Sequence, residues 1–237
     1  MRTILVSGGN GYLAKDLIKL MKNDGCRFIL VDISYKKGVL EEGAYFMNTD
    51  ITDGTSLEKQ LLELNLKKRF KLDGIVNTPA WNNFKPLRET TYPEIEQIIS
   101  TKLKGYANVI KACQPYLSKG SSIVNVGSVQ AHTSRDPGAL YAAANGGVIS
   151  LTKALAVEFR KGMNRVNVVT PGGFDSTIYK KAHPDWQIRV RNGQCLKTRD
   201  VSKAIRFLLS DESRGINGTE IIVDGGISAL RVSSSDF

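Results

Sequence analysis

The sequence has few cysteines and histidines for its 237 residues. The three cysteines, Cys26, Cys113 and Cys195, lie far apart and show no C-x-x-C spacing, which argues against a disulfide-stapled fold and a cysteine-ligated metal. His132 and His183 stand alone without metal-ligand spacing, so we expect no metal site. This cysteine usage favours a reducing compartment, and we expect a cytoplasmic protein.

Secretion and membrane signals are also lacking. From Met1 the chain goes straight into a short apolar run and a glycine turn, with no signal-peptide apolar region or cleavage site. We find no stretch long enough to span a bilayer. The sequence therefore predicts no membrane partner.

The charge is unbalanced, with 33 Lys and Arg against 23 Asp and Glu, a formal net charge of +10. This balance alone fits a nucleic-acid partner, an anionic substrate or a uniformly basic protein. However, the sequence has no run of five basic residues, no basic helix and no aromatic-rich RNA-binding signature. Nucleic-acid binding is therefore the weakest of the three interpretations.

What is present is a regular alternation of strand-length and helix-length segments. We expect strands at 2–7, 27–33, 44–50, 72–78, 121–128, 165–171 and 219–226, and helices at 55–66, 92–117 and 139–161. This alternation is typical of a parallel sheet covered by helices on both faces. We predict an α/β, Rossmann-type doubly wound sheet of about seven strands in a single domain, residues 1–237, with ligand at the carboxyl ends of the strands.

The first strand leads directly into a glycine-rich turn and a helix, "ILVSGGNGYLAKDL". Gly9, Gly11 and Ala14 satisfy G-x-G-x-x-G/A, and Gly8 gives a neighbouring spacing with the last two. Glycine permits close approach of a pyrophosphate, and the helix N-terminus supplies amide donors. We expect this turn to bind a dinucleotide through Gly8, Gly9, Asn10, Gly11, Tyr12 and Leu13.

An acidic residue stands where the dinucleotide fingerprint requires one. Asp32 ends the second strand about 20 residues after the turn, as a ribose-binding carboxylate should. The alternative is an ordinary strand-end aspartate. A carboxylate there repels a 2′-phosphate, so we predict NAD as cofactor, while Lys36 and Lys37 keep NADP open.

Several separated motifs resemble the short-chain dehydrogenase/reductase family from Met1 to about residue 228. They are "SGGNGYLA", "DITD" at 50–53, "NTPA" at 77–80, "SIVNVGS", "YAAANGGVISLTKALAVEF", "RVNVVTPGGFDST" and "GTEIIVDGG". The resemblance implies cofactor contacts from Asp50, Ile51, Asn77, Ala80, Pro171, Gly172, Phe174, Ser176 and Thr177. It also implies a small-molecule substrate, a substrate lid at about 174–199, and a homodimer or homotetramer built on helices 92–117 and 139–161.

The catalytic pattern of this family is altered in the chain. The resemblance implies a tetrad of Asn, Ser, Tyr and Lys, in which Ser128 and Tyr141 match the serine and the tyrosine. The lysine position holds Asn145, and the helix asparagine position holds Lys102. The two residue types have traded places.

This exchange bears on the acid/base chemistry of Tyr141. A phenol has a pKa near ~10, and proton transfer at neutral pH needs a drop of roughly 2 to 3 pKa units. An ammonium about 4 Å away supplies this, whereas an amide does not. Asn145 therefore retains only a hydrogen-bonding role toward a cofactor ribose. Our leading hypothesis is that Lys102 provides the charge.

Three further interpretations stay open. If Lys102 points to solvent, the protein is a catalytically impaired NAD(H)-binding sensor or subunit. The basic side chains within 180–199 suggest an anionic substrate of the sugar, nucleotide-sugar or acyl-carrier type, although a solvated basic face in a protein that is basic throughout explains them slightly better. A sugar epimerase or dehydratase fits the glycine spacing, but the C-terminal region is short for that branch.

Overall fold

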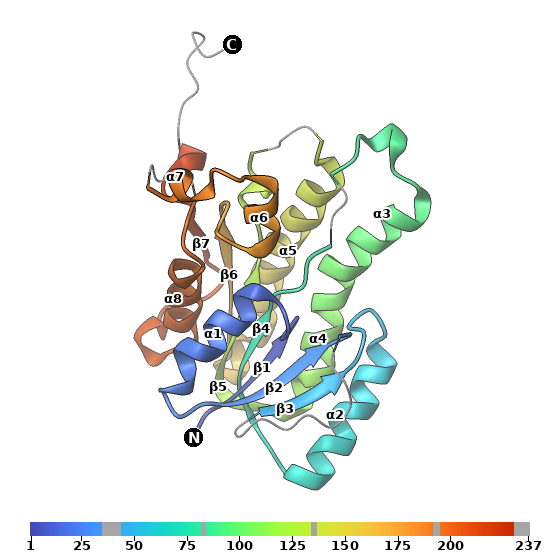
Figure 1. Cartoon of the computed structure of the whole chain (residues 1–237). Helices are drawn as coiled ribbons and strands as arrows, with labels where there is room; N and C mark the ends of the chain where they lie inside the picture. The colour runs from blue at the N-terminus through green and yellow to red at the C-terminus, as the bar shows by residue number, and fades with distance from the viewer. Residues whose placement is uncertain (35–43, 82–83, 134–136, 192–194, 230–237) are drawn as a thin grey trace.

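A seven-stranded parallel sheet forms the centre of the molecule, in the order β3-β2-β1-β4-β5-β6-β7 (Figure 1). The computed structural model describes residues 1–34, 44–81, 84–133, 137–191 and 195–229. The strands are β1 (Thr3–Ser7), β2 (Arg27–Asp32), β3 (Ala44–Asn48), β4 (Leu72–Asn77), β5 (Leu117–Val126), β6 (Arg165–Pro171) and β7 (Glu220–Val223). The predicted doubly wound, single-domain fold is confirmed.

Helices cover both faces of this sheet. They are α1 (Tyr12–Lys22), α2 (Gly54–Lys68), α3 (Tyr92–Ile99), α4 (Gly105–Cys113), α5 (Ala139–Glu158), α6 (Thr177–Ala182), α7 (Trp186–Arg191) and α8 (Thr198–Leu209). The α1 and α8 helices share one hydrophobic core, and α2, α4 and α5 share the other. Successive β1 residues pack into opposite cores. Leu5 packs with α2, α4 and α5, whereas Ile4 and Val6 pack with α1 and α8.

The strand order reverses at β1 and β4. From β1 the sheet grows through β2 and β3 on one side and through β4 to β7 on the other. In such a sheet the crevice at the carboxyl ends beside the reversal point is the usual ligand site. The glycine turn after β1 and the segment after β4 both open onto this edge.

The segment 92–117, predicted as one helix, is divided in the structure. The α3 helix ends at Ile99, a π-helical turn spans Ser100–Lys104, and α4 then runs from Gly105 to Cys113. The predicted end at 117 is wrong, because Pro115 cannot continue the helical hydrogen bonds and β5 begins at Leu117. The predicted strand at 121–128 correspondingly starts earlier and ends at Val126.

The α5 helix corrects the expectation that no segment reaches membrane-spanning length. The helical run Ala139–Gly162 has 24 residues and a mean hydropathy of 1.2, so it passes that test by length and composition. Its apolar residues Val148, Ile149 and Ala156 belong to a core that they share with strands of the sheet. One face of α5 is therefore part of the core, and 33% of the apolar window is buried.

Candidate active site

A cavity of about 470 Å³ lies at the carboxyl edge of the sheet. Its lining comes from the turn after β1, the end of β2, the segments after β3 and β4, the π-helical turn, the end of β5, the start of α5 and the segment after β6. This volume is within the range of small-molecule sites.

The glycine turn has the conformation that its sequence predicts. Gly8 has a φ of +70°, and its N–H donates to Val31 O at 2.8 Å. A Cβ at Gly8 would lie 2.6 Å from Thr78 Oγ1, so only glycine fits there. Gly11 precedes α1 without a side-chain cap, which leaves first-turn N–H groups for a ligand. These features fit a pyrophosphate.

Asp32 lies at the end of β2 beside this turn. Its carboxylate accepts from Asn10 N at 3.1 Å and from Ser34 N at 2.9 Å, which fixes its orientation. Asp32 also lines the cavity. Lys36 and Lys37, which kept NADP open, lie outside the described residues.

The segment after β3 lines the cavity through Asp50 and Ile51. Asp50 Oδ1 accepts from Thr52 N at 2.8 Å, and Asn108 Nδ2 of α4 donates to Ile51 O at 2.9 Å. The α4 helix is therefore tied to the same segment that the family resemblance places at the adenine.

Most of the other predicted site residues also line the cavity. These are Gly8, Gly11, Tyr12, Leu13, Ala80, Lys102, Ser128, Tyr141, Pro171, Gly172, Phe174 and Ser176. Gly9, Asn10, Asn77 and Asn145 are not among the lining residues, and the side chain of Thr177 lies outside the described part of the chain.

Asn77 belongs instead to a buried polar ladder that crosses the sheet. It accepts from Ser7 Oγ at 2.7 Å and donates to Asn125 Oδ1 at 2.9 Å, and Asn125 donates to Thr152 Oγ1 of α5 at 3.0 Å. Asn77 is fully buried. Its hydrogen bonds are used within the protein, and the structure does not bring its side chain to the cavity.

Ser128 and Tyr141 meet at the cavity wall. Ser128 directly follows Gly127 at the end of β5, and Tyr141 lies in the first turn of α5. Burial raises the pKa of the Tyr141 hydroxyl, and hydrogen bonding with Ser128 and with Asn145 lowers it. Burial has the larger effect, so Tyr141 needs a further source of stabilisation for its anion.

Asn145 lies one turn after Tyr141 on α5 and is fully buried. Its Nδ2 donates to Tyr141 O at 2.7 Å, within the helix. Its Oδ1 is buried and has no hydrogen-bond partner among the described residues. A buried acceptor of this kind is costly unless a donor reaches it. The residue supplies no net charge.

Lys102 points inward from the π-helical turn. The residue is only 2% exposed and lines the cavity. Its Nζ donates to Val126 O at 2.6 Å and to the Tyr106 hydroxyl at 3.0 Å, and lies 3.5 Å from Pro79 O. Burial lowers the pKa of Lys102 to about 7. The amine therefore lies between the ends of β4 and β5, at the wall that carries Ser128.

The π-helical turn and a glycine allow this placement. Gly105 N donates to Ser100 O, five residues back, which closes the wider turn. A Cβ at Gly105 would lie 2.6 Å from Ile51 Cδ1, so glycine lets the helix pack closely on the cavity wall. Lys102 and Tyr106, four residues apart, then face the same way.

Several lining residues were missed by sequence reasoning, namely Val31, Ile33, Thr49, Thr78, Pro79, Trp81, Gln97, Thr101, Val126 and Gly127. Thr78 and Pro79 are the two middle residues of the "NTPA" motif, of which only Asn77 and Ala80 were predicted to contact the cofactor. The motif could also have indicated that its two middle residues line the cavity.

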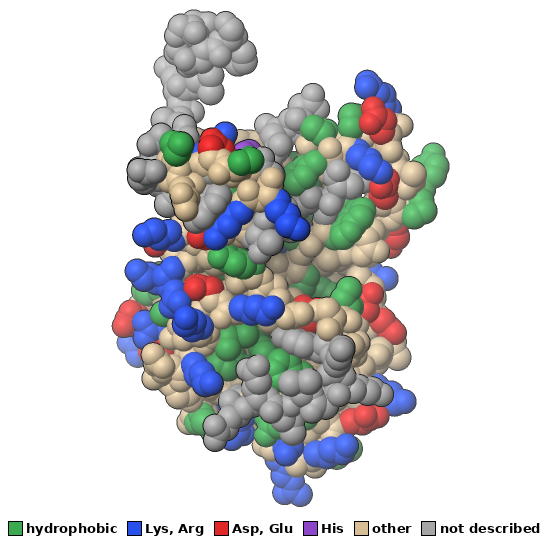
Figure 2. Space-filling model, viewed as in Figure 1, with side chains coloured by type: hydrophobic (Ala, Val, Ile, Leu, Met, Phe, Trp, Pro, Cys, Tyr) green, Lys and Arg blue, Asp and Glu red, His purple; other side chains and the backbone are tan. Residues whose placement is uncertain are grey.

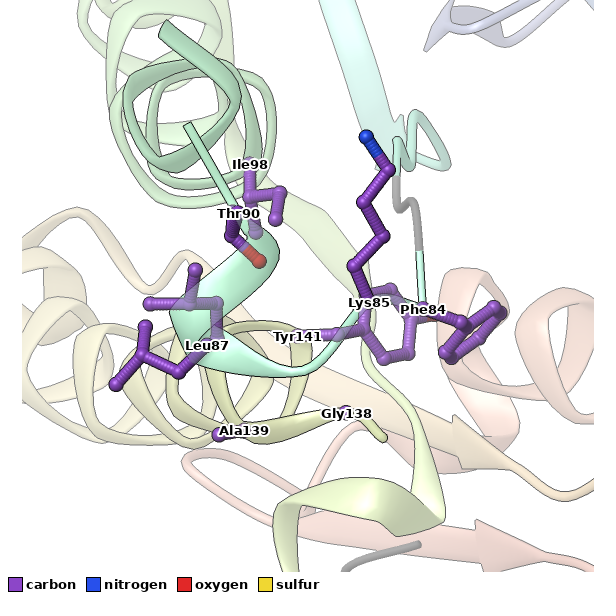
Figure 3. A pocket seen from close by; sticks show the side chains of 9 residues that line it. Phe84, Lys85, Leu87, Thr90, Ile98, Gly138, Ala139 and Tyr141 are labelled. Atoms are coloured by element: carbon purple, nitrogen blue, oxygen red, sulfur yellow. The ribbon is translucent and has the colours of Figure 1, made fainter. Parts of the chain in front are cut away.

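A second cavity, with about 10 Å³ of room, borders Tyr141 (Figure 3). Its lining includes Phe84, Leu87, Thr90 and Ile98. The rings of Phe84 and Tyr141 are 5.8 Å apart and meet edge to face. This space is about the size of one water molecule, so it does not accommodate a substrate.

The predicted lid region, 174–199, contains α6 and α7. Three of its basic side chains are close to carboxylates: Lys180 to Asp175 at 3.6 Å, Arg189 to Asp185 at 2.9 Å, and Arg199 to Asp16 at 2.9 Å. Among the described residues that line the large cavity, Lys102 is the one basic side chain. Among the lid residues whose side chains the structure describes, no basic side chain lines the cavity, although Lys180 Nζ lies 3.4 Å from the hydroxyl of Tyr12, which does.

The charged surface is similarly mixed. Figure 2 shows Lys and Arg side chains interspersed with Asp and Glu over the face on which α1 and the lid lie. A nucleic-acid site requires basic side chains gathered into a patch or stripe. In the region of α1 and α8, Arg199 and Arg206 are paired with Asp16 and Asp24.

Comparisons with known proteins identify the family of the chain. The family model described as enoyl-(acyl carrier protein) reductase matches residues 13–228. An uncharacterized oxidoreductase of Schizosaccharomyces pombe is 30% identical, covering 96% of this chain and 91% of the relative. The 3-oxoacyl-[acyl-carrier-protein] reductase of Thermotoga maritima is 29% identical, covering 95% and 97%. The chain belongs to the short-chain dehydrogenase/reductase family and is an oxidoreductase.

Solved structures show the same architecture. A SCOR enzyme from Clostridium thermocellum, solved in its apo form, superposes with a TM-score of 0.85 at 26% identity, covering all of this chain and 96% of that one. The ligand-free aldohexose dehydrogenase of Thermoplasma acidophilum gives a TM-score of 0.87 at 24% identity, covering 98% and 96%. The second likeness, at this identity, concerns the fold alone.

Proposed function

We propose that this protein is an NAD(H)-dependent oxidoreductase that interconverts an alcohol and a carbonyl compound. In this proposal, Lys102 supplies the positive charge that stabilises the anion of Tyr141. The bound nicotinamide supplies or accepts the hydride. In the reductive direction, Ser128 donates a hydrogen bond to the carbonyl oxygen and Tyr141 gives that oxygen its proton. The proton must leave Tyr141 as the hydride arrives, so a tyrosinate forms and needs a nearby cation.

The observation that carries this proposal is the inward position of Lys102. A solvated lysine would have left Tyr141 without a cation, which was the alternative interpretation. Instead, the Lys102 amine is buried, lines the same cavity as Tyr141 and is hydrogen-bonded beside Ser128. A buried ammonium acts strongly on a neighbouring phenol because the local dielectric is low.

The carboxylate of Asp32 supports NAD rather than NADP. It lines the cavity beside the glycine turn, and its hydrogen bonds to Asn10 N and Ser34 N keep it in place. A 2′-phosphate would meet this negative charge directly. We therefore expect tighter binding of NADH than of NADPH.

For the substrate we propose an uncharged, small carbonyl compound. Trp81 and Phe174 line the cavity, and the paired lid residues Lys180, Arg189 and Arg199 are absent from its lining. The expectation of an anionic substrate rested on the basic lid, and these ion pairs give it no support. A wall of this composition favours apolar contact with a few placed polar groups.

The test begins with NADH and NADPH titrated by nucleotide fluorescence, followed by turnover on uncharged ketones and aldehydes and on 2-oxo and 3-oxo acids. We expect NADH to bind more tightly and the uncharged compounds to turn over faster. Faster turnover of the oxo acids would instead favour the interpretation that the substrate is anionic. Tight NADH binding without turnover of any carbonyl would indicate the sensor or subunit instead.

The variant Lys102→Met tests the charge. Loss of roughly 3 to 4 kcal/mol of tyrosinate stabilisation corresponds to a loss of about 10² to 10³ in turnover. NADH affinity should stay within about twofold. The matched control is Lys104→Met on the same π-helical turn, whose side chain is exposed and does not line the cavity. Equal turnover of both variants and the wild type would refute the role of Lys102.

A further inference from the structure

Tyr106 is a fully buried tyrosine whose hydroxyl lies within 3.1 Å of three polar atoms. These atoms are Lys102 Nζ at 3.0 Å, Pro79 O at 3.0 Å and Val126 O at 3.1 Å. Tyr106 matches no motif of the sequence, and it does not itself line the cavity. A buried phenol requires partners, and here all of them belong to the surroundings of Lys102.

One consistent set of hydrogen bonds follows from these distances. A tyrosine hydroxyl donates one proton and accepts others, while an ammonium only donates. Lys102 Nζ then donates to Val126 O and to the Tyr106 oxygen, and the Tyr106 hydroxyl donates to Pro79 O. The long, flexible lysine chain is held at two points, one on the strand end and one on its own helix.

The Tyr106 ring adds a second restraint. Lys102 Nζ lies 5.0 Å from the ring centroid, within the range of a cation–π contact. The two residues are four apart across the junction between the π-helical turn and α4, so they lie on one helix face. The tyrosine therefore favours a single position of the amine.

The amine held by Tyr106 lies at the cavity wall that Tyr141 also lines. Its acceptor Val126 O is two residues before Ser128, and Ser128 hydrogen-bonds with Tyr141. Without the hydroxyl of Tyr106, the Lys102 amine would lose one acceptor and have room to rotate away from Val126 O.

We propose that Tyr106 is a positioning residue, whose hydroxyl holds the amine of Lys102 at the end of β5 so that its charge serves Tyr141. This inference rests on the proposed function, since it assigns Tyr106 a role through Lys102. It makes Lys102 and Tyr106 a unit: each is expected to lose its effect on catalysis when the other is absent.

The experiment is a double-mutant cycle with Lys102→Met, Tyr106→Phe and the combined variant, measured as kcat and KM for carbonyl reduction. Tyr106→Phe removes only the hydroxyl, and we expect kcat to fall about tenfold with KM and NADH affinity nearly unchanged. In the Lys102→Met background, Tyr106→Phe should have no further effect. Tyr116→Phe, in the short 3-10 turn Gln114–Tyr116 just before β5, is the control for loss of a tyrosine hydroxyl elsewhere.

The titration of Lys102, followed by NMR of ¹³Cε-labelled lysine, gives a readout independent of activity. Its titratable neighbours here are Tyr106 and Tyr141. Removing an acceptor destabilises the ammonium, so Tyr106→Phe should move the Lys102 titration to lower pH. An unchanged titration with additive kinetic effects would overturn the role of Tyr106. If Lys102→Met were fully active, the proposed function would fail instead.

Discussion

Two pairs of side chains, each four residues apart in helical backbone, differ in charge, and one member of each pair, Tyr141 and Lys102, lines the same cavity. On α5, Tyr141 and Asn145 form a neutral pair, in which the asparagine donates to Tyr141 O at 2.7 Å. On the π-helical turn and α4, Lys102 and Tyr106 form a pair with a titratable amine, 3.0 Å from Nζ to hydroxyl. The acid/base group and its cation thus come from different helices.

This division separates two roles that one helix combines in the family pattern. In the proposed mechanism, the pair on α5 presents the hydroxyl that exchanges the proton. The pair on the neighbouring helix holds the charge at the ends of β4 and β5, through Pro79 O and Val126 O. Because the two pairs lie on different helices, each can be substituted separately, which makes the comparison open to experiment.

The largest effect is expected when the lysine and the asparagine are exchanged, so that both return to the positions they have in the family pattern. The double variant Lys102→Asn, Asn145→Lys places the ammonium on α5, one turn from Tyr141. We expect its turnover to exceed that of Lys102→Asn alone by about 10- to 100-fold, because a cation again stabilises the tyrosinate. Steady-state carbonyl reduction measures both. Equal turnover of the two variants would show that charge near Tyr141 is not what the site requires.

A smaller effect is expected from pH. Carbonyl reduction needs the Tyr141 hydroxyl and the Lys102 ammonium together, and burial lowers the pKa of Lys102 to about 7. Above that pH the amine loses its proton, so kcat/KM for reduction should fall by about tenfold per pH unit. The profile of Lys102→Met should have no such limb near neutrality. A wild-type profile that stays flat from pH 7 to 9 would contradict the assignment.

The smallest effect concerns stability. The unfolded chain keeps the Lys102 proton up to a pKa near 10.5, while the folded chain releases it near pH 7. The unfolded state then binds more protons in this window, and stability rises with pH. The stability of the wild type relative to Lys102→Met should therefore increase between pH 7 and 10, by at most ~1.4 kcal/mol per pH unit. Denaturant unfolding at several pH values checks this, and parallel curves would contradict it.

The sequence was most informative where a local motif dictates a backbone shape. Gly8, Gly11 and Asp32 were predictable because a strand, a tight turn and a helix N-terminus leave few choices of residue. Ser128 and Tyr141 followed from their resemblance to a family pattern. Lys102 could be selected as a candidate because it occupies the asparagine position of the family pattern, while Asn145 occupies the lysine position.

Other features had no signal in the sequence. The π-helical turn depends on how the helix packs against Ile51, and its residues read as an ordinary helix. Tyr106 was not singled out, because its hydroxyl finds its partners only in the folded chain. Asn77 matched a cofactor motif, yet its amide is used in a ladder that joins Ser7 and Asn125 across the sheet.

The most direct test of the central claim is the single-turnover rate of carbonyl reduction at pH 6 and at pH 9, in the wild type, in Lys102→Met and in Lys104→Met. Burial lowers the pKa of Lys102 to about 7, so the amine carries its charge at pH 6 and has lost it at pH 9. We predict that the wild-type rate exceeds that of Lys102→Met by about 10² to 10³ at pH 6 and that this ratio shrinks towards one at pH 9, while Lys104→Met follows the wild type. The same ratio at both pH values would contradict the claim that Lys102 supplies the charge.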